Sequence, residues 1–283
     1  MTSPRILLSA WNLRPNKRRG QNFLSDPSTA EMIVSRSKIS REDIVLEVGA
    51  GLGALTIPLA RNAKKVYAVE NDQQLTDLLK IELFGSNLSN VVIIKKNILY
   101  FNINEIAEAL SHKIVVMGNL PYNISSQIIV KLIKSRNLVR RAVLMLQKEL
   151  AQRIAAEPGC KDYGRLTVML RYCSNINVIA DVKSPLFFPK PRVDSRVVEI
   201  EFKNSLKYLA DDETFLFKVI KSAFGKRRKT LKNALAGSEL DIDVKTILHV
   251  LESVGIDPIR RAETLTVQEF VRLSNALKTP MFS

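Results

Sequence analysis

Four consecutive residues, Asn119-Leu120-Pro121-Tyr122, carry the groups needed to hold and activate an amino group on a nucleobase. The lone pair of such an exocyclic nitrogen is delocalised into the ring, so an enzyme must aim hydrogen-bond acceptors at the amino hydrogens. The side-chain carbonyl of Asn119 and the backbone carbonyl of Leu120 are suitable acceptors, and Pro121 fixes the turn that points them inward. Tyr122 offers an aromatic face for a flipped base. The alternative is an ordinary Asn-Pro turn followed by a buried tyrosine.

A second aromatic candidate lies in the segment 187–195, where prolines stiffen a loop that presents Phe187 or Phe188 as another stacking ring. Lys190 and Arg192 in the same loop are placed to meet neighbouring phosphates. We therefore expect Phe187 to form a second wall of a base pocket. The alternative is a proline-stiffened connection whose phenylalanines belong to the core.

A glycine-rich turn, Gly49-Ala50-Gly51-Leu52-Gly53, follows a short apolar run earlier in the chain. Gly49 and Gly51 tolerate left-handed conformations and have no side chain, so the backbone can approach a ligand closely. One residue separates Gly51 from Gly53, whereas the dinucleotide fingerprint needs two, which disfavours a pyrophosphate. Glu70 ends the next apolar run, where a carboxylate accepts hydrogen bonds from both hydroxyls of a ribose. Together these features predict a nucleoside cofactor, and their spacing resembles the S-adenosylmethionine (SAM) methyltransferase superfamily.

Asn97 ends the third apolar run, where that superfamily commonly carries an aspartate that accepts a hydrogen bond from the adenine amino group of the cofactor. Asparagine keeps a carbonyl acceptor but loses the charge, so we expect Asn97 to make this contact without an ionic component. The alternative is an asparagine that caps the following turn.

The elements that must position these residues alternate between strand and helix. Short apolar runs bounded by turns predict strands, and longer stretches with helical periodicity predict helices. Parallel strands joined by crossover helices are the economical interpretation, so the predicted fold class is α/β with a doubly wound sheet. The predicted strands are 43–48, 65–70, 91–94, 114–117 and 142–146, and the predicted helices among them are 54–60, 73–83 and 125–134.

The pattern changes after a last alternating strand at 197–202, because every later segment has helical periodicity. We place a domain boundary near Asn204. This gives a first domain of residues 1–204, which carries a basic N-terminal arm, and a helical domain of residues 205–283. The helices predicted in the second domain are 215–223, 230–235, 244–254 and 267–277.

The chain is strongly basic, with a formal net charge of +15 over 283 residues. Such a surplus attracts polyanions, which makes nucleic acid the leading class of partner, with a basic surface kept for solubility as the alternative. Clustering favours nucleic acid, because a surface that follows phosphates needs concentrated charge. The clusters are Lys17-Arg18-Arg19, the set Lys131, Lys134, Arg136, Arg140 and Arg141, and the run Lys226-Arg227-Arg228-Lys229 with Lys232.

Cysteine and histidine are too few for a zinc site or a disulfide framework, since Cys160, Cys173, His112 and His249 have no metal-ligand spacing. We therefore expect no metal. The apolar stretch from Ile6 to Leu13 is too short and too polar for a signal peptide, and no run approaches the length that spans a membrane. The sequence predicts a soluble, cytoplasmic protein.

Taken together, the motifs resemble those of the KsgA-type ribosomal RNA adenine dimethyltransferases along nearly the whole chain. Without this resemblance, residues 21–24 would be an undistinguished lead-in to a helix. The matching segments are Gln21-Asn22-Phe23-Leu24 after the basic arm, Glu47 to Thr56, Val69-Glu70, Asn119 to Tyr122, Gln147-Lys148-Glu149, Phe187-x-Pro189-x-Pro191 with Val193-Asp194-Ser195, and Phe224 to Leu231.

The resemblance implies a Rossmann-like, seven-stranded SAM-methyltransferase sheet with a small all-α C-terminal domain that contributes to RNA binding. It implies that SAM donates two methyl groups to N6 of each of two adjacent adenosines in the 3′-terminal hairpin of small-subunit (16S) rRNA, leaving S-adenosylhomocysteine. It also implies a monomer that acts on a pre-ribosomal particle, a role in ribosome biogenesis, and an N-terminal element folded over the site. The residues it implies around SAM are Asn22, Leu24, Gly49, Glu70, Asn97 and Asn119.

Three alternatives remain at this stage. An Erm-type enzyme would methylate one adenine of large-subunit rRNA, and it usually has isoleucine where Leu120 stands; the segment from Phe224 to Leu231 also argues against it. A non-catalytic assembly or transcription factor on the same fold would not need the intact motif from Asn119 to Tyr122. A nicotinamide oxidoreductase would be separated from these by comparing the binding of SAM and NAD.

Overall fold

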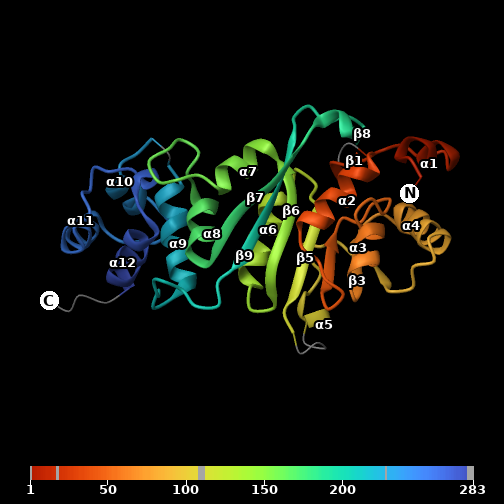
Figure 1. Ribbon diagram of the computed structural model, residues 1–283. Helices are drawn as coiled ribbons and strands as arrows, with labels where there is room; N and C mark the ends of the chain where they lie inside the picture. The colour runs from red at the N-terminus through yellow and green to blue at the C-terminus, as the bar shows by residue number, and fades with distance from the viewer. Residues whose placement is uncertain (1, 17–18, 108–111, 227, 279–283) are drawn as a thin grey trace. The chain divides into compact units, whose positions relative to one another are not determined.

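The computed structural model describes residues 2–16, 19–107, 112–226 and 228–278. Lys17, Arg18 and Arg227, which belong to the basic clusters, lie outside these ranges. The chain divides into two compact units, and the first contains residues 1–151 and 176–202. A sheet of seven strands, in the order β4-β3-β2-β5-β6-β9-β7, runs through this unit (Figure 1). Its strands are β2 (Ile44–Val48), β3 (Lys65–Glu70), β4 (Val91–Lys95), β5 (Ile114–Asn119), β6 (Val139–Gln147), β7 (Ser174–Val182) and β9 (Ser195–Phe202).

The five strands from β2 to β6 are parallel, and β9 is antiparallel to β6. The apolar runs that form β2 and β5 are buried, as expected for strands covered on both faces. The predicted α/β fold with a seven-stranded sheet is therefore confirmed, although β7 was not among the predicted strands. Because the strands are parallel, their carboxyl ends meet at one edge of the sheet, where α/β folds bind ligands.

Helices cover the sheet because each has one apolar face. Ile33 of α2 and Leu59 of α3 are buried in one cluster with Val45 of β2 and Val115 of β5. The helices of this part of the chain are α1 (Pro4–Ala10), α2 (Pro27–Arg36), α3 (Thr56–Asn62), α4 (Gln73–Gly85), α5 (Asn104–Ala107), α6 (Ser125–Lys134) and α7 (Lys148–Ile154).

A second, two-stranded sheet joins parts of the chain that are far apart in sequence. Strand β1 (Phe23–Leu24) pairs in antiparallel orientation with β8 (Phe187–Phe188), so that Phe23 faces Phe188 and Leu24 faces Phe187. The 3₁₀ turn η2 (Ser184–Leu186) leads into β8. This pairing fixes the N-terminal segment beside the carboxyl edge of the large sheet.

The second unit is helical and contains residues 152–175 together with those from 203 onward. The chain therefore divides next to the predicted boundary near Asn204, but residues 152–175 were expected in the first domain and belong to the second unit. The reason is the packing of α8, because Tyr172 lies edge-on against Phe217 of α9, with ring centroids 6.1 Å apart. The elements of this unit are α8 (Arg165–Cys173), α9 (Glu213–Phe224), α10 (Leu231–Ala236), α11 (Val244–Ser253), η3 (Ala262–Thr264) and α12 (Val267–Lys278).

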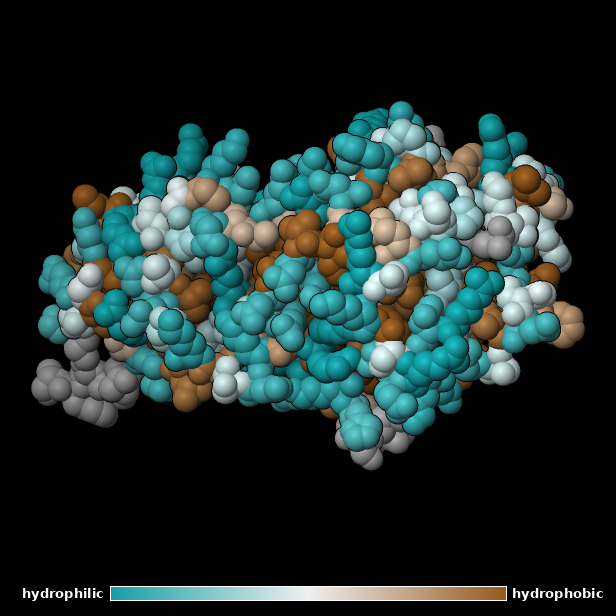
Figure 2. All heavy atoms as spheres, viewed as in Figure 1, coloured by the Kyte–Doolittle hydropathy of each residue, from teal (hydrophilic) through white to brown (hydrophobic). Residues whose placement is uncertain are grey.

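Hydrophilic side chains cover most of the face shown in Figure 2, and hydrophobic ones occur there in small, separate groups. Among the helices that the structure describes, none has the length and apolar character needed to cross a membrane. The described residues likewise contain no group of three or more His, Cys, Asp and Glu side chains that could hold a metal ion.

Candidate active site

A cavity of about 260 Å³ opens at the carboxyl edge of the large sheet. It brings together every predicted site residue except Phe187, although these residues come from five separate stretches of the chain. Strands β2, β3 and β5, the turn after β4 and the N-terminal segment supply its walls. The predicted residues that line it are Asn22, Leu24, Gly49, Gly51, Glu70, Asn97, Asn119, Leu120, Pro121 and Tyr122.

The glycine turn after β2 has the backbone geometry that its sequence predicts. Gly49, Gly51 and Gly53 all have positive φ angles, of 76°, 54° and 87°. A Cβ atom on Gly118, at the end of neighbouring β5, would lie 2.4 Å from the carbonyl oxygen of Val48. Glycine at this position therefore lets β2 and β5 approach closely at the floor of the cavity.

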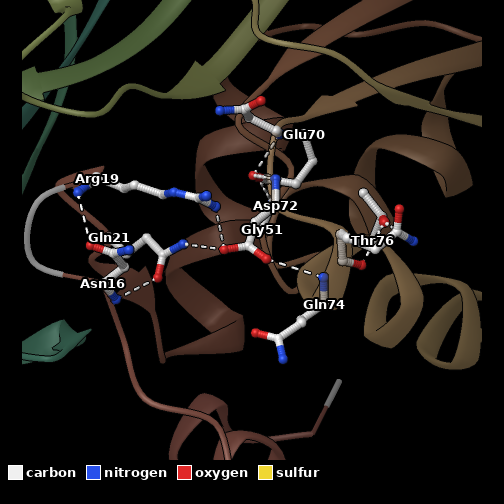
Figure 3. Close-up of polar contacts among 10 residues, drawn as sticks. Asn16, Arg19, Gln21, Gly51, Glu70, Asp72, Gln74 and Thr76 are labelled. Carbon is white, nitrogen blue, oxygen red and sulfur yellow. Dashed lines mark hydrogen bonds and ion pairs between the residues drawn. The ribbon is translucent and has the colours of Figure 1, made fainter.

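Glu70, the last residue of β3, holds the glycine turn in place. Its Oε2 accepts the backbone N–H of Gly51 at 3.0 Å, and its Oε1 accepts those of Asn71 and Asp72 at 2.8 and 2.9 Å (Figure 3). Burial raises the pKa of Glu70, and the three N–H donors act in the opposite direction. A carboxylate has about four acceptor positions, so Glu70 can also accept hydrogen bonds from a bound diol.

Asp72, two residues after Glu70, anchors the N-terminal segment to the start of α4. Its Oδ2 accepts hydrogen bonds from Arg19 at 2.6 Å and from Gln21 at 3.3 Å, while Oδ1 caps α4 through the N–H of Gln74 (Figure 3). Gln21 in turn accepts the N–H of Asn16 at 2.7 Å. Sequence reasoning did not identify Asp72, because its partners are more than fifty residues away in the chain.

We expect Asp72→Ser to weaken SAM binding, because serine still caps α4 but is too short to reach Arg19 and Gln21. Arg19 is about half exposed, so solvent screening limits the effect to roughly three- to tenfold in affinity. Calorimetry measures the affinity, and hydrogen exchange of residues 20–24 reports whether the segment has loosened. Asp77→Ser, which removes an exposed acid from the same helix, is the matched control and should leave both unchanged. Equal effects from the two variants would mean that Asp72 does not position the segment.

Asn119 ends β5 with its side chain fixed by the N-terminal segment. Its Nδ2 donates a hydrogen bond to the backbone carbonyl of Asn22 at 2.9 Å. No described residue donates to its Oδ1, which is therefore available to an amino group in the cavity. Two hydrogen bonds hold the following turn in place. The N–H of Leu120 donates to the carbonyl of Met145 at 3.1 Å, and the hydroxyl of Ser125 donates to the carbonyl of Pro121 at 2.8 Å.

Tyr122 forms part of the cavity wall with its hydroxyl tied down. The hydroxyl lies 2.8 Å from Oγ of Ser195, at the start of β9. Burial raises the pKa of Tyr122, so the phenol is neutral at physiological pH. A half-buried ring that is held at both ends is a suitable stacking surface for a base.

Asn97 makes the turn-capping contact and is also one of the residues that line the cavity. Its Oδ1 accepts the N–H of Leu99 at 3.0 Å. An amide oxygen has two lone pairs, so this contact leaves one acceptor position for an adenine amino group.

Phe187 is not among the residues that line this cavity, and its place in the wall of a base pocket stays a prediction. Its side chain is 4% exposed and belongs to the core cluster that contains Leu24 and Met145. The cause is the pairing of β8 with β1, since successive strand residues point to opposite sides and this register turns Phe187 inward. Phe188 instead packs with Leu7 and Phe23 in a second cluster.

Comparisons with known proteins agree with this geometry. The model of the family described as "Ribosomal RNA adenine dimethylase" matches residues 12–278. "Ribosomal RNA small subunit methyltransferase A" of Desulforapulum autotrophicum is 54% identical over 277 residues, which cover 98% of this chain and 97% of that protein. The crystal structure of a dimethyladenosine transferase from Plasmodium falciparum has a TM-score of 0.75 and 27% identity, with 89% and 95% of the two chains covered. That of the 23S rRNA methyltransferase ErmE has a TM-score of 0.66 and 22% identity, with 91% and 100% covered, and shows the fold alone.

Proposed function

The chain belongs to the ribosomal RNA adenine dimethylase family, and on that basis we propose the substrate and the roles of the residues around the cavity. It is a SAM-dependent methyltransferase that modifies adenine in ribosomal RNA. The proposed targets are two adjacent adenosines in the 3′-terminal hairpin of small-subunit rRNA, each of which receives two methyl groups on N6. This choice of subunit rests on the relative that is 54% identical and is named for the small subunit.

The donors and acceptors around the cavity fit SAM. A carboxylate at the end of β3 suits a ribose, the asparagine after β4 has a free acceptor position for adenine, and the glycine turn leaves room between them. When bound, SAM would supply an activated methyl group on its sulfonium, and loss of that methyl group would leave the neutral thioether S-adenosylhomocysteine.

One observation carries the catalytic proposal. The side-chain nitrogen of Asn119 donates to the carbonyl of Asn22, and its oxygen accepts a hydrogen bond from none of the described residues. That oxygen and the backbone carbonyl of Leu120 orient the amino hydrogens of the target base, so that the nitrogen lone pair faces the methyl group. Tyr122 stacks on the flipped base. The methylated nitrogen loses its proton to water, so the site needs no strong base.

The alternatives considered from the sequence are less well supported. The likeness to ErmE lies in the fold, which enzymes with either rRNA substrate share. A non-catalytic assembly factor would not need Asn119 and Tyr122 in the wall of a cavity with Glu70 and Asn97. A nicotinamide enzyme would need a pyrophosphate site, and the glycine spacing disfavours one.

A methylation assay with labelled SAM tests the proposed substrate. Unmodified small subunits, naked 16S rRNA and large-subunit precursors are incubated separately with the protein, and the product is digested to nucleosides. We expect N6,N6-dimethyladenosine from small-subunit particles at the highest rate. Transfer to large-subunit RNA alone would overturn the assignment in favour of an Erm-type enzyme.

The biological setting is also part of the proposal. We propose that a monomer acts in the cytoplasm on a pre-ribosomal small subunit, and that this encounter contributes to ribosome biogenesis. Sedimentation of the protein alone and with small subunits tests both the oligomeric state and the particle that it binds.

The basic clusters differ in how much charge they offer to RNA. In the second cluster, Arg141 is 8% exposed and pairs with Glu199 at 2.8 Å, so its charge is used inside the protein. Arg140 pairs with Asp43, and the Nζ of Lys131 bonds the carbonyl of Leu99. All five residues of this cluster were expected to bind phosphates. For Arg141 this expectation is wrong, because its side chain is buried and paired with Glu199. In the cluster after α9, Lys226, Arg228 and Lys229 are exposed.

We therefore predict that Arg228→Gln with Lys229→Gln weakens RNA binding and flattens its dependence on salt. Each lost phosphate contact should reduce the log–log slope by about 0.7–0.9, because fewer counterions are released. The measurement is a titration of an rRNA hairpin at several salt concentrations. The matched control is Lys245→Gln with Arg272→Gln, which removes two exposed charges elsewhere in the same unit. Equal slopes for the two double variants would show that Arg228 and Lys229 form an ordinary solvated surface.

A further inference from the structure

Ser195, the first residue of β9, lies behind the wall of the cavity and touches that wall at Tyr122. Its Oγ is 2.8 Å from the hydroxyl of Tyr122, while Ser195 itself is not among the residues that line the cavity. Ser195 is 0% exposed. A buried hydroxyl without a partner costs free energy, and Tyr122 is the partner that offsets this cost.

The sheet topology brings Ser195 to the site although it is far from Tyr122 in the sequence. Strand β9 is antiparallel to β6, so its first residue lies at the carboxyl edge of the parallel strands, where the cavity opens. In this register Ser195 faces Gln147, the last residue of β6. Asn119, which ends β5, pairs with Met145 of the same strand β6. Ser195 therefore lies at the same edge as Tyr122, which follows β5.

The backbone at Ser195 is held by contacts that do not involve Tyr122. The carbonyl of Asp194 accepts the N–H of Lys148, at the start of α7, at 3.0 Å. The carboxylate of Asp194 accepts the N–H of Ser184, the first residue of η2, at 2.9 Å. These contacts join the start of β9 to two other elements, so the hydroxyl of Ser195 is a preorganised anchor for the phenol.

We propose that Ser195 is a positioning residue for methyl transfer, because its hydroxyl fixes the orientation of the Tyr122 ring on which the target adenine stacks. This inference rests on the proposed stacking role of Tyr122. An aromatic side chain turns about its χ1 and χ2 bonds, and a hydrogen bond at the far end of the ring restricts both. A ring that cannot tilt keeps the amino nitrogen of the stacked base in line with the methyl group.

Single-turnover methylation by Ser195→Ala tests this proposal. With saturating SAM and unmodified small subunits, the rate should fall by about three- to tenfold, the effect of losing one neutral hydrogen bond. SAM affinity, measured by calorimetry, should not change, because Ser195 does not line the cavity. Ser37→Ala is the matched control, since it removes an equally buried hydroxyl at the end of α2, and it should leave both quantities unchanged. A wild-type rate for Ser195→Ala would overturn the proposal.

A double-mutant cycle with Tyr122→Phe separates positioning from a general loss of structure. Tyr122→Phe keeps the ring and removes the same hydrogen bond from the other side, so it also serves as the test if Ser195→Ala is unstable. It should slow transfer about as much as Ser195→Ala does. The double variant should be no slower than either single variant, because there is one hydrogen bond to lose. Additive losses would mean that Ser195 supports the site by another route and would contradict the proposal.

A fluorescent base reports the stacking directly. 2-Aminopurine replaces one target adenine in the small-subunit rRNA hairpin, and its fluorescence rises when the base leaves the RNA stack and falls when it stacks on an aromatic ring. The complex with wild type should be dimmer than the complex with Tyr122→Ala, and the complex with Ser195→Ala should lie between them. Equal fluorescence for wild type and Ser195→Ala would show that the ring keeps its orientation without the hydrogen bond.

The rate of Tyr122→Ala distinguishes failure of this inference from failure of the proposed function. Loss of the stacking ring should slow transfer by about five- to a hundredfold. If Tyr122→Ala methylates at the wild-type rate, the proposed stacking role fails, and this inference fails with it. If Tyr122→Ala is slow while Ser195→Ala and Tyr122→Phe both keep the wild-type rate, the stacking role survives and this inference alone fails.

Discussion

Replacing Asn119 by alanine should lower the single-turnover rate of methyl transfer by a few hundredfold while RNA binding survives. The side-chain oxygen of Asn119 is a preorganised, uncharged acceptor, so it can orient an amino group without trapping a proton. Loss of one such contact that tightens in the transition state costs on the order of 3–4 kcal/mol. The assay uses saturating SAM and unmodified small subunits, because Asn119 also lines the cofactor cavity.

Two companion variants separate catalysis from structure. Asn119→Asp keeps an acceptor but cannot donate to the carbonyl of Asn22. Its single-turnover rate therefore measures how much that 2.9 Å hydrogen bond contributes to methyl transfer. Asn137→Ala removes an exposed asparagine elsewhere in the same unit and should behave as wild type. If Asn119→Ala methylates small subunits at the wild-type rate, the motif is a structural turn and the catalytic assignment fails.

Glu70→Ala should weaken SAM binding by about ten- to a hundredfold, since losing hydrogen bonds to a charged group costs roughly 1.5–3 kcal/mol. The structure adds a second cause, because the same carboxylate accepts hydrogen bonds from the N–H groups of Gly51 and Asp72. Without this carboxylate, the glycine turn loses an anchor and the ligand loses a hydrogen-bond acceptor. Calorimetry with SAM measures the change.

Glu70→Gln distinguishes these causes, because its single carbonyl oxygen replaces only part of the carboxylate. An affinity between those of wild type and Glu70→Ala is expected. Circular dichroism confirms that each variant is folded before it is titrated. Unchanged SAM affinity in folded Glu70→Ala would remove Glu70 from the cofactor site.

Helices and strands whose ends are marked by nearby residues were predicted well from the sequence. Strand β3 and helix α6 have the predicted bounds, 65–70 and 125–134, because turn residues or a change in hydropathy mark both ends. Helix α2 begins after Asp26, whose carboxylate caps it through the N–H of Thr29, and aspartate is among the residues favoured at this position. Strand β7 and helices α1, α7 and α8 were not predicted.

The second unit shows why domain membership is harder to predict than secondary structure. Residues 152–175 precede the last strands of the sheet in sequence, so a linear division assigns them to the first domain. The structure groups them with the helical unit, because α8 buries its apolar side against α9 and α12. The unit to which a helix belongs depends on which apolar faces pack together, and hydropathy periodicity does not predict that packing.

For the site, the sequence was sufficient to predict which residues at the ends of strands line the cavity. Glu70, Asn97 and Asn119 each end or closely follow an apolar run, and parallel strands bring such ends to one edge. The glycines of the turn also needed no tertiary information, since positive φ angles restrict the residue type.

The contacts that join distant segments could not be predicted from the sequence. The pairing of β1 with β8 turned Phe187 into the core, and Asp72 gained Arg19 and Gln21 as partners. Folding places Arg141 in an internal ion pair with Glu199, whereas Oε2 of Glu47 is buried with no hydrogen-bond partner among the described residues. A sequence states which groups a chain carries, but desolvation and pairing energies depend on what surrounds each group once the chain has folded, and those surroundings come from residues far away along it.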